Sequence, residues 1–313
     1  MKGIELSKAY FEAFGKEMLE THFDDVLPLL AIGLVGSGSD CYGYDDEISQ
    51  DHDFEPGFCI FLPDESLVDR KTEFLLERAY ARLPKEFMGM TRSALNPVGG
   101  NRHGVIRMGD FFLQKVGSPD GRLSLEQWFS VPEHGLLEAT NGEVFCDEAG
   151  QFSAIRERLA YFPDEVRLKK LAGHLLLMGQ AGQYNYNRCI ARGETAPAQL
   201  AIFEFVKSSV HCIYLLNKAY MPYYKWWFKG LERFSVLGGL AEDLEHLISS
   251  GNTAKEAKEK SDNIEQICAA VSEELLSQGL SQLKSPEMER QSYAVNEKIK
   301  DNHIRTLHIL QGV

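Results

Sequence analysis

The sequence has no long apolar run, no apolar leader and no paired cysteine motif. No stretch approaches the roughly 18 consecutive apolar residues that a membrane span needs, so we expect no membrane partner. The opening segment, MKGIELS, carries no apolar leader, and we therefore expect no secretion signal. The six cysteines are scattered without a CxxC pair. These features predict a cytoplasmic protein with reduced thiols and neither a zinc site nor a disulfide framework.

Positive charge is also scarce. The chain has 33 lysines and arginines against 46 aspartates and glutamates, a net charge of −13. Such a charge opposes long-range attraction to DNA or RNA, so long nucleic acid is not expected as a partner, whereas a small cationic acceptor would be attracted. With 313 residues, 44% of them hydrophobic, the chain is long enough for two domains with real cores.

A glycine-rich stretch lacks the residues of the two commonest phosphate motifs. Gly36-Ser37-Gly38-Ser39-Asp40 follows the apolar run 31–35. A P-loop would have Gly-Lys-Ser/Thr at the end of the glycines, but no lysine stands there, and a dinucleotide fingerprint would have a third glycine at Cys41. The glycines can still turn backbone N–H groups toward an anion, and the serine hydroxyls add donors. The stretch therefore predicts a phosphate-binding turn.

A pair of carboxylates follows this turn. Asp51 and Asp53 stand two residues apart in a segment that reads as one strand ending at Leu62. On an extended strand both side chains would project from the same face, with His52 on the other, and two such carboxylates suit Mg²⁺ or Mn²⁺ held against a triphosphate. The alternative is a glycine turn between buried strands beside a solvated acidic loop, which explains the turn but not the Asp pair.

This combination of a Gly-Ser turn, a spacer and Asp-x-Asp resembles the nucleotidyltransferase superfamily, which has a polymerase-β-like fold. The wider stretch, with Gly36-Ser37-Gly38-Ser39-Asp40 and then DDEISQDHD ending at Asp53, is similar to a narrower bacterial family, DUF4037. The segments 142–147, 182–188 and 220–226 are similar to that family as well. The resemblance implies an NTP bound at Gly36 to Asp40, with Asp51 and Asp53 as the catalytic metal ligands.

Much of the superfamily takes a third acidic residue from the third core strand. We expect this strand at 103–108, where the sequence has Arg107 and no carboxylate before Asp110. Asp110, Glu126 and Asp147 are the candidates for a third ligand, and Glu126 or Asp147 for a separate general base. Surface charge is the alternative explanation for each of them.

The order of patterns predicts an α+β protein, with a nucleotidyltransferase-type mixed sheet and helices in residues 1–163 and an all-α domain in residues 164–313 that contributes to the substrate pocket. We expect further elements at these positions: helices at 4–22 and 67–83, strands at 31–35, 58–62 and 142–147, a loop or flap at 84–102, and later helices at 166–192, 197–220, 253–283 and 286–310. Thr253 and Glu256 form a capping-box pattern, and Glu256 stands four residues before Lys260.

Two polar clusters interrupt the apolar stripes of the helical half. The first comprises Gln180, Gln183, Tyr184, Asn185, Asn187 and Arg188. The second places Lys225 inside an aromatic run, 223–227. We interpret both as walls of a nucleotide or acceptor pocket in which Arg188 and Lys225 meet phosphate and aromatic faces stack on a base. The alternative for the aromatic run is packing between domains, with Lys225 lying along the rings.

The sequence thus predicts a Mg²⁺- or Mn²⁺-dependent nucleotidyltransferase. It would move an NMP, with AMP from ATP favoured, to a hydroxyl or amine of a small or medium acceptor and release pyrophosphate. One alternative is a nucleotide-binding regulator or toxin–antitoxin component on the same fold with weak catalysis or none. Another is an enzyme that modifies tRNA or protein. The sequence names neither the acceptor nor the oligomeric state.

Overall fold

The computed structural model describes residues 1–47, 54–93 and 102–313. The chain forms two compact units, the first comprising 1–124 and 131–160 and the second 125–130 and 161–313. All described strands lie in the first unit, and the second unit is helical, so the protein is α+β. The predicted domain limits, 1–163 and 164–313, differ from these units in the position of the boundary and in the assignment of 125–130.

The first unit is built on a four-stranded mixed sheet. Its strands are β1 (Ala31–Leu34), β2 (Cys59–Leu62), β5 (Gly104–Arg107) and β6 (Glu143–Asp147), in the order β5-β2-β1-β6. β2 and β5 are parallel, whereas β1 is antiparallel to both β2 and β6. These strands lie where the apolar runs predict them. Residues 54–58 are not in a strand, so the predicted continuous strand from 51 to 62 is wrong in its described part before Cys59.

The pairing register gives the sheet two distinct ends. Gly33 pairs with Cys59, and Cys59 pairs with Gly104, so the end of β1 and the starts of β2 and β5 lie together. We call this the glycine end, because the Gly36–Gly38 turn follows β1 there. Ala31 pairs with both Phe61 and Asp147, which places the end of β6 at the opposite end of the sheet.

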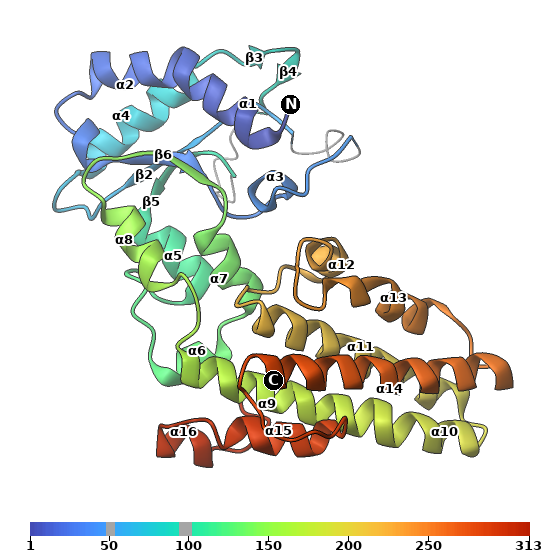
Figure 1. Ribbon diagram of the computed structural model, residues 1–313. Helices are drawn as coiled ribbons and strands as arrows, with labels where there is room; N and C mark the ends of the chain where they lie inside the picture. The colour runs from blue at the N-terminus through green and yellow to red at the C-terminus, as the bar shows by residue number, and fades with distance from the viewer. Residues whose placement is uncertain (48–53, 94–101) are drawn as a thin grey trace. The chain divides into compact units, whose positions relative to one another are not determined.

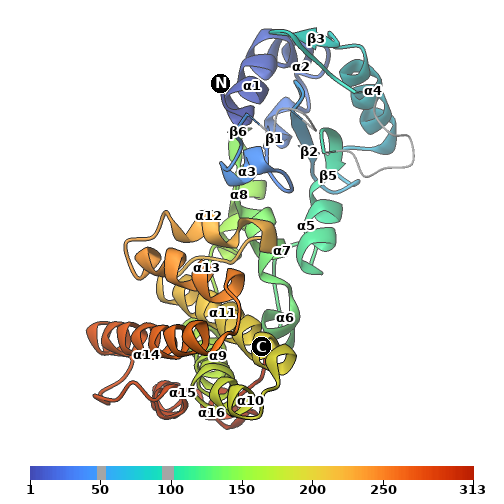
Figure 2. The ribbon, with the colours of Figure 1, turned by 90° about the vertical axis from the view of Figure 1, so that its right-hand side faces the viewer.

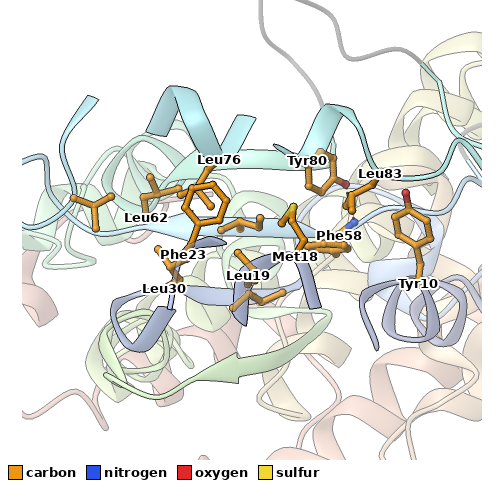
Figure 3. Packing of buried hydrophobic residues seen from close by; sticks show 13 residues of the cluster. Tyr10, Met18, Leu19, Phe23, Leu30, Phe58, Leu62, Leu76, Tyr80 and Leu83 are labelled. Carbon is orange, nitrogen blue, oxygen red and sulfur yellow. Dashed lines mark hydrogen bonds between the residues drawn. The ribbon is translucent and has the colours of Figure 1, made fainter. Parts of the chain in front are cut away.

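Helices cover both faces of this sheet (Figures 1 and 2). The N-terminal segment is helical from Gly3 to His22, as α1 (Gly3–Tyr10), a π-helical stretch (Phe11–Gly15) and α2 (Lys16–His22), and it shares one face with α4 (Arg70–Ala81). Figure 3 shows the hydrophobic cluster between these helices and β1 and β2. Its members are Tyr10, Met18, Leu19, Phe23, Leu30, Ile32, Phe58, Ile60, Leu62, Val68, Leu76, Tyr80 and Leu83.

The second face packs against α5 (Met108–Val116) and α8 (Gln151–Arg158). Side chains alternate along β2, so Phe61 points away from Ile60 and Leu62 and meets this second layer. Its ring lies 5.2 Å from that of Phe111 and 4.2 Å from that of Phe152. A third helix, α7 (Glu133–Thr140), packs against α5 on the same side. Both faces of the sheet are therefore buried, which leaves its ends for a site.

The segment predicted as a flap has a different role in its described part. Residues 86–87 (β3) and 90–91 (β4) form a small hairpin, with Met88 and Gly89 at positive φ in the turn. The ring of Phe87 lies 5.5 Å from that of Tyr10 and 5.6 Å from that of Phe14. This contact anchors the hairpin on the N-terminal helix, so residues 86–91 form an anchored hairpin where a loop or flap over the site was expected.

The second unit is a bundle of helices. Their bounds are α6 (Leu125–Ser130), α9 (Asp164–Met178), a π-helical stretch (Gly179–Tyr186), α10 (Asn187–Ala191), α11 (Thr195–Leu216), α12 (Trp227–Leu231), α13 (Ala241–Ser249), α14 (Ala254–Ser277), α15 (Met288–Asn296) and α16 (Asn302–Thr306). α9 packs against α11 and α15 at the centre. By length and composition α11 could cross a membrane, but 67% of its apolar window is buried within this unit.

The structure departs from two sequence predictions in this bundle. The final helix expected at 286–310 is two short helices, α15 and α16, separated by 297–301. Glu256 and Lys260 attract each other electrostatically as expected, but their hydrogen bonds go elsewhere. Glu256 caps α14 with Thr253 in the predicted capping box, while Lys260 Nζ donates to Gln199 Oε1 at 3.0 Å and Ser250 O at 2.9 Å. The Lys260 side chain is fully buried, and its ammonium group needs acceptors there, which Gln199 and Ser250 provide.

Candidate functional site

The first glycine of the turn that follows β1 is held by the side chain of Asn141. Gly36 has φ 107° and Gly38 has φ 124°, conformations that glycine adopts without strain. Asn141 Oδ1 accepts from Gly36 N at 2.8 Å, and Asn141 Nδ2 donates to Gly36 O at 2.8 Å. The carbonyl of Asn141 in turn accepts from Arg156 Nη2 at 2.7 Å. The first glycine is thus fixed on both backbone groups, and its N–H is not available to a ligand.

Arg102 lies across the second half of the turn. Its Nε donates to Ser37 O at 3.0 Å, and its Nη2 forms an ion pair of 2.5 Å with Asp40 Oδ1. A Cβ on Gly38 would lie 2.1 Å from Nη2, so a side chain here would displace the guanidinium group from its position. Asp40 is buried and also accepts from the N–H of Cys41 at 2.7 Å. Asp40, predicted to bind nucleotide, therefore holds Arg102 at the turn.

Ser37, at the tip of the turn, lies between an ammonium group and a carboxylate. Lys115 Nζ donates to Ser37 Oγ at 2.9 Å, and Ser37 Oγ donates to Glu138 Oε2 at 2.9 Å. Lys115 and Glu138 also form a direct ion pair of 2.5 Å. Tyr42, in the short helix α3 (Ser39–Tyr42), donates from its hydroxyl to Glu138 Oε1 at 2.8 Å. The turn therefore has a cation on each side, Lys115 at its hydroxyl and Arg102 at its carbonyl.

The close approach of two helices brings Lys115 and Glu138 together. Lys115 lies in the last turn of α5, and Glu138 lies in the second half of α7. A Cβ on Gly135 would lie 2.4 Å from the carbonyl oxygen of Lys115, so this position of α7 requires glycine. Gly117, with φ 72°, ends α5 immediately after this contact.

The charges at the turn shift the acidities of their neighbours. Burial raises the pKa of Glu138, but Lys115, Tyr42 and Ser37 together outweigh it, and the net effect is a pKa below the ordinary value for glutamate. Burial and the adjacent Glu138 raise the pKa of Tyr42. Glu138 is therefore an anion near neutral pH, and Tyr42 keeps its proton and remains a donor.

The predicted metal ligands Asp51 and Asp53 lie outside the described residues, as does His52. The nearest described carboxylate after them is Glu55, whose Oε1 lies 3.5 Å from Nδ1 of the buried His103, longer than an ordinary hydrogen bond. Glu55 also accepts from the backbone N–H of Ser93. The contact with His103 is the main cause that lowers the pKa of Glu55 to about 2, against the opposing effect of burial.

The three candidates for a further carboxylate do not gather at the glycine end. Asp147 ends β6 at the opposite end of the sheet, where its Oδ2 accepts from Ser153 N at 2.7 Å and caps α8. Asp110 lies in the first turn of α5, after the end of β5, and is exposed. Glu126 is exposed on α6 in the other unit. Within the ranges 1–47, 54–93 and 102–313, no group of three His, Cys, Asp or Glu side chains is placed to hold a metal ion.

The two cations predicted for the helical domain are separated. Arg188 stacks on the ring of Tyr184, 4.6 Å away, and Lys225 Nζ lies 5.0 Å from the ring of Trp226. α10, which carries Arg188, precedes α11, and Lys225 follows it. The 22 residues of α11 span about 33 Å, so the two side chains lie toward opposite ends of this helix. The structure does not bring them together.

The predicted polar cluster at residues 180–188 partly joins helices and partly borders a depression on the surface. Gln183, in the π-helical stretch, contacts two other helices: its Oε1 accepts from Met288 N of α15 at 2.9 Å, and its Nε2 donates to Glu265 Oε2 of α14 at 2.9 Å. Other members, with neighbours from α11, border an open depression of about 450 Å³. It is lined by Leu177, Gln180, Ala181, Asn185, Cys189, Pro197, Leu200, Ala201 and Glu204.

The fold and the turn define an α+β protein whose small mixed sheet ends in a glycine turn flanked by two paired cations. Residues 128–227 match the family model described as a domain of unknown function, DUF4037, and this match supports the relationship to that family. The matched range covers less than half of the chain and begins after the glycine turn. It contains Glu138 and Asn141, as well as Arg188 and Lys225. No curated protein gives a significant match to the chain.

Sequence reasoning missed Arg102, Lys115, Glu138 and Asn141. Lys115 and Glu138 lie 78 and 101 residues from Ser37 in the chain, and Asn141 lies 105 residues from Gly36. The sequence holds one local indication that α5 and α7 meet closely: Gly117 and Gly135 interrupt the helical patterns at their point of contact.

Proposed function

We propose that the protein is a Mg²⁺-dependent nucleotidyltransferase of the DUF4037 family. It transfers an NMP, with AMP from ATP favoured, to a hydroxyl or amine of a small or medium acceptor and releases pyrophosphate. The observation that carries the proposal is the glycine turn at the sheet end, where Lys115 and Arg102 both contact Ser37. A turn with cations on two sides and an exposed serine at its tip suits a phosphate chain.

The phosphate chain would lie along the turn at Ser37. Lys115 offers its ammonium group on the hydroxyl side of this serine, and Arg102 offers a guanidinium group on its carbonyl side. Because Asn141 fixes Gly36 on both backbone groups, the backbone at the start of the turn is already ordered before a ligand binds. A rigid site of this kind loses little conformational entropy on binding.

Asp51 and Asp53 would hold the metal ion. Both are carboxylates, and hard oxygen donors of this kind fit Mg²⁺ or Mn²⁺. When bound, the ion would supply charge neutralisation of the triphosphate and activation of the attacking oxygen. The acceptor oxygen or nitrogen would form a bond to the α-phosphorus as the bond to the bridging oxygen breaks, and pyrophosphate would leave.

A pyrophosphate-release assay with ATP, Mg²⁺ and a cell-extract acceptor fraction tests this function. Asp51→Asn and Asp53→Asn should each lower release by about 100-fold or more, since metal polarisation typically contributes several kcal/mol. Glu47→Gln, which removes an exposed carboxylate from the same segment, should retain the wild-type rate. Equal rates for the wild type and both aspartate variants would refute the proposal.

A second candidate is a nucleotide-binding regulator on the same fold. The positions of Asp110, Asp147 and Glu126 favour it, because two of them lie away from the glycine end and the third belongs to the other unit. This protein would bind ATP with Mg²⁺ but release no pyrophosphate with any acceptor fraction. Calorimetry and the release assay on the same preparation separate the two functions.

A further inference from the structure

Lys115 has donor capacity left for a ligand. An ammonium group carries three N–H donors, and within the described part of the chain Lys115 directs two of them, to Ser37 Oγ at 2.9 Å and to Glu138 Oε2 at 2.5 Å. The side chain is only 16% exposed, so its position is set by packing within α5 and α7. Ser37 itself is exposed at the tip of the turn. An anion that reaches Ser37 would therefore also reach Lys115.

Glu138 opposes that contact. Its carboxylate neutralises Lys115 at a side-chain exposure of 13%, where solvent screens the charge poorly. It also accepts the Ser37 hydroxyl proton at 2.9 Å, so the hydroxyl is directed away from an incoming anion. A phosphate group at the turn must therefore compete with a carboxylate for both donors.

Glu138 has a second anchor that does not involve the turn. Tyr42 donates to its other oxygen, Oε1, at 2.8 Å, and the Tyr42 hydroxyl keeps its proton because burial raises its pKa. The carboxylate can therefore give up Ser37 and Lys115 without losing all of its hydrogen bonds. The free-energy cost of this exchange of partners is then smaller than the cost of leaving the buried carboxylate with no partner at all.

We propose that Lys115 is the cation that binds the phosphate chain at the glycine turn and that Glu138 is its competing counter-charge, displaced when a polyphosphate binds. This inference rests on the proposed function, because it names the residues that would hold the phosphates of the NTP. It assigns to Lys115 a direct ligand contact and to Glu138 a positioning role through Lys115 and Ser37. Glu138 thereby limits the affinity of the empty site for phosphate.

Isothermal titration of inorganic triphosphate and of ATP, both with Mg²⁺, tests the proposal on the full chain. Lys115→Met should lower the affinity for both ligands by about tenfold or more, the loss of one charge-assisted contact or about 1.4 kcal/mol. Glu138→Gln should raise it severalfold, because the glutamine keeps the size of the side chain but no longer neutralises Lys115. The double variant Lys115→Met/Glu138→Gln should bind like Lys115→Met alone.

A matched ion pair at the other end of the sheet provides the control. Arg107 and Glu73 form a pair of 2.7 Å with side-chain exposures of 9% and 15%. Glu73→Gln removes one negative charge from a pair buried to a similar extent, so it should leave the affinity unchanged. If it raised the affinity as much as Glu138→Gln does, net charge alone would explain the gain, and the proposal would be overturned.

Measurements of stability and of wild-type binding distinguish failure of this inference from failure of the proposed function. Lys115→Met leaves Glu138 buried without its cation, so melting curves accompany the titrations. If this variant does not fold, the double variant, which removes both charges, decides. A loss of affinity in Glu138→Gln, or unchanged affinity in the variants that lack Lys115, would overturn this inference and show that the ion pair has a structural role only. The proposed function would then still stand if the wild type binds ATP. If the wild type binds neither ATP nor triphosphate, the proposed function and this inference fail together.

Discussion

Asn141 and Gly36 are joined by two hydrogen bonds of 2.8 Å that run in opposite directions, from Gly36 N to the side-chain oxygen and from the side-chain nitrogen to Gly36 O. The amide of Asn141 thus takes the place that a neighbouring strand would take beyond the end of β1. It lies at the C-terminal end of α7, so the position of the glycine turn is tied to the helix that also carries Glu138.

The Asn141 contact should be specific for an amide. Asn141→Ala leaves both backbone groups of Gly36 without their partner, and Asn141→Asp places an oxygen opposite the Gly36 carbonyl. We expect each variant to lower the free energy of unfolding by about 1–3 kcal/mol and to weaken ATP binding. Urea titration gives the stability. An aspartate variant as stable as the wild type would contradict the two-bond description.

Gly135 should tolerate no side chain, because a Cβ there would lie 2.4 Å from the backbone oxygen of Lys115. Gly135→Ala should force α5 and α7 apart and destabilise the protein by about 1–3 kcal/mol. Gly109→Ala is the matched control, since the nearest atom to its Cβ would be 3.5 Å away and alanine favours the helix by about 1 kcal/mol. Thermal melting of the two variants should show shifts of opposite sign. A neutral Gly135→Ala would mean that the helices do not depend on this contact.

The buried His174, stacked on the partly exposed His211, should make stability depend on pH. His174 and His211 stack with ring centroids 4.1 Å apart, and burial, followed by the neighbouring His211, lowers the pKa of His174 well below its ordinary value. The unfolded chain takes up a proton near pH 6.5, whereas the folded protein does so only at lower pH. Stability is therefore fully present above pH about 6.5 and falls as the pH is lowered toward the folded pKa.

Urea unfolding between pH 7.5 and 5 measures this effect. Glu55 and Glu138 also have lowered pKa values, but their effect on stability falls at a pH below the ordinary glutamate pKa and so below this window. His174→Gln should flatten the dependence, and His246→Gln, at an exposed position, should leave it as in the wild type. A slope that persists in His174→Gln would assign the effect to other groups.

Arg188 and Lys225 should act independently. Arg188 lies near Leu200, because its neighbour Cys189 borders the same depression as Leu200. Lys225 lies near His211, because Trp227, two residues further on, contacts His211 with ring centroids 6.1 Å apart. Leu200 and His211 are about 16 Å apart along α11, so one phosphate group cannot meet both cations. A double-mutant cycle of Arg188→Ala and Lys225→Ala on ATP affinity should give a coupling below about 0.5 kcal/mol. A larger coupling would mean that one ligand contacts both.

The sequence by itself determined the local elements and the class of fold. Apolar runs bounded by turn residues located β1, β2, β5 and β6, and the pattern at Thr253 and Glu256 located the start of α14, because these signals depend on neighbours in the chain. The glycine turn was also evident, since its residue types limit the backbone locally. The final helix failed because its apolar periodicity continues through 297–301, where the chain leaves the helical conformation.

Only the tertiary structure decided which side chains meet at the turn. Lys115 and Glu138 lie in two helices and Asn141 directly follows the second, and apart from the glycines at 117 and 135 nothing local marks this region. They reach Ser37 and Gly36 because β1, α5 and α7 pack around one end of the sheet and Gly135 lets the helices approach. The same packing placed Asp147 at the opposite end, since an antiparallel strand carries its last residue away from the turn.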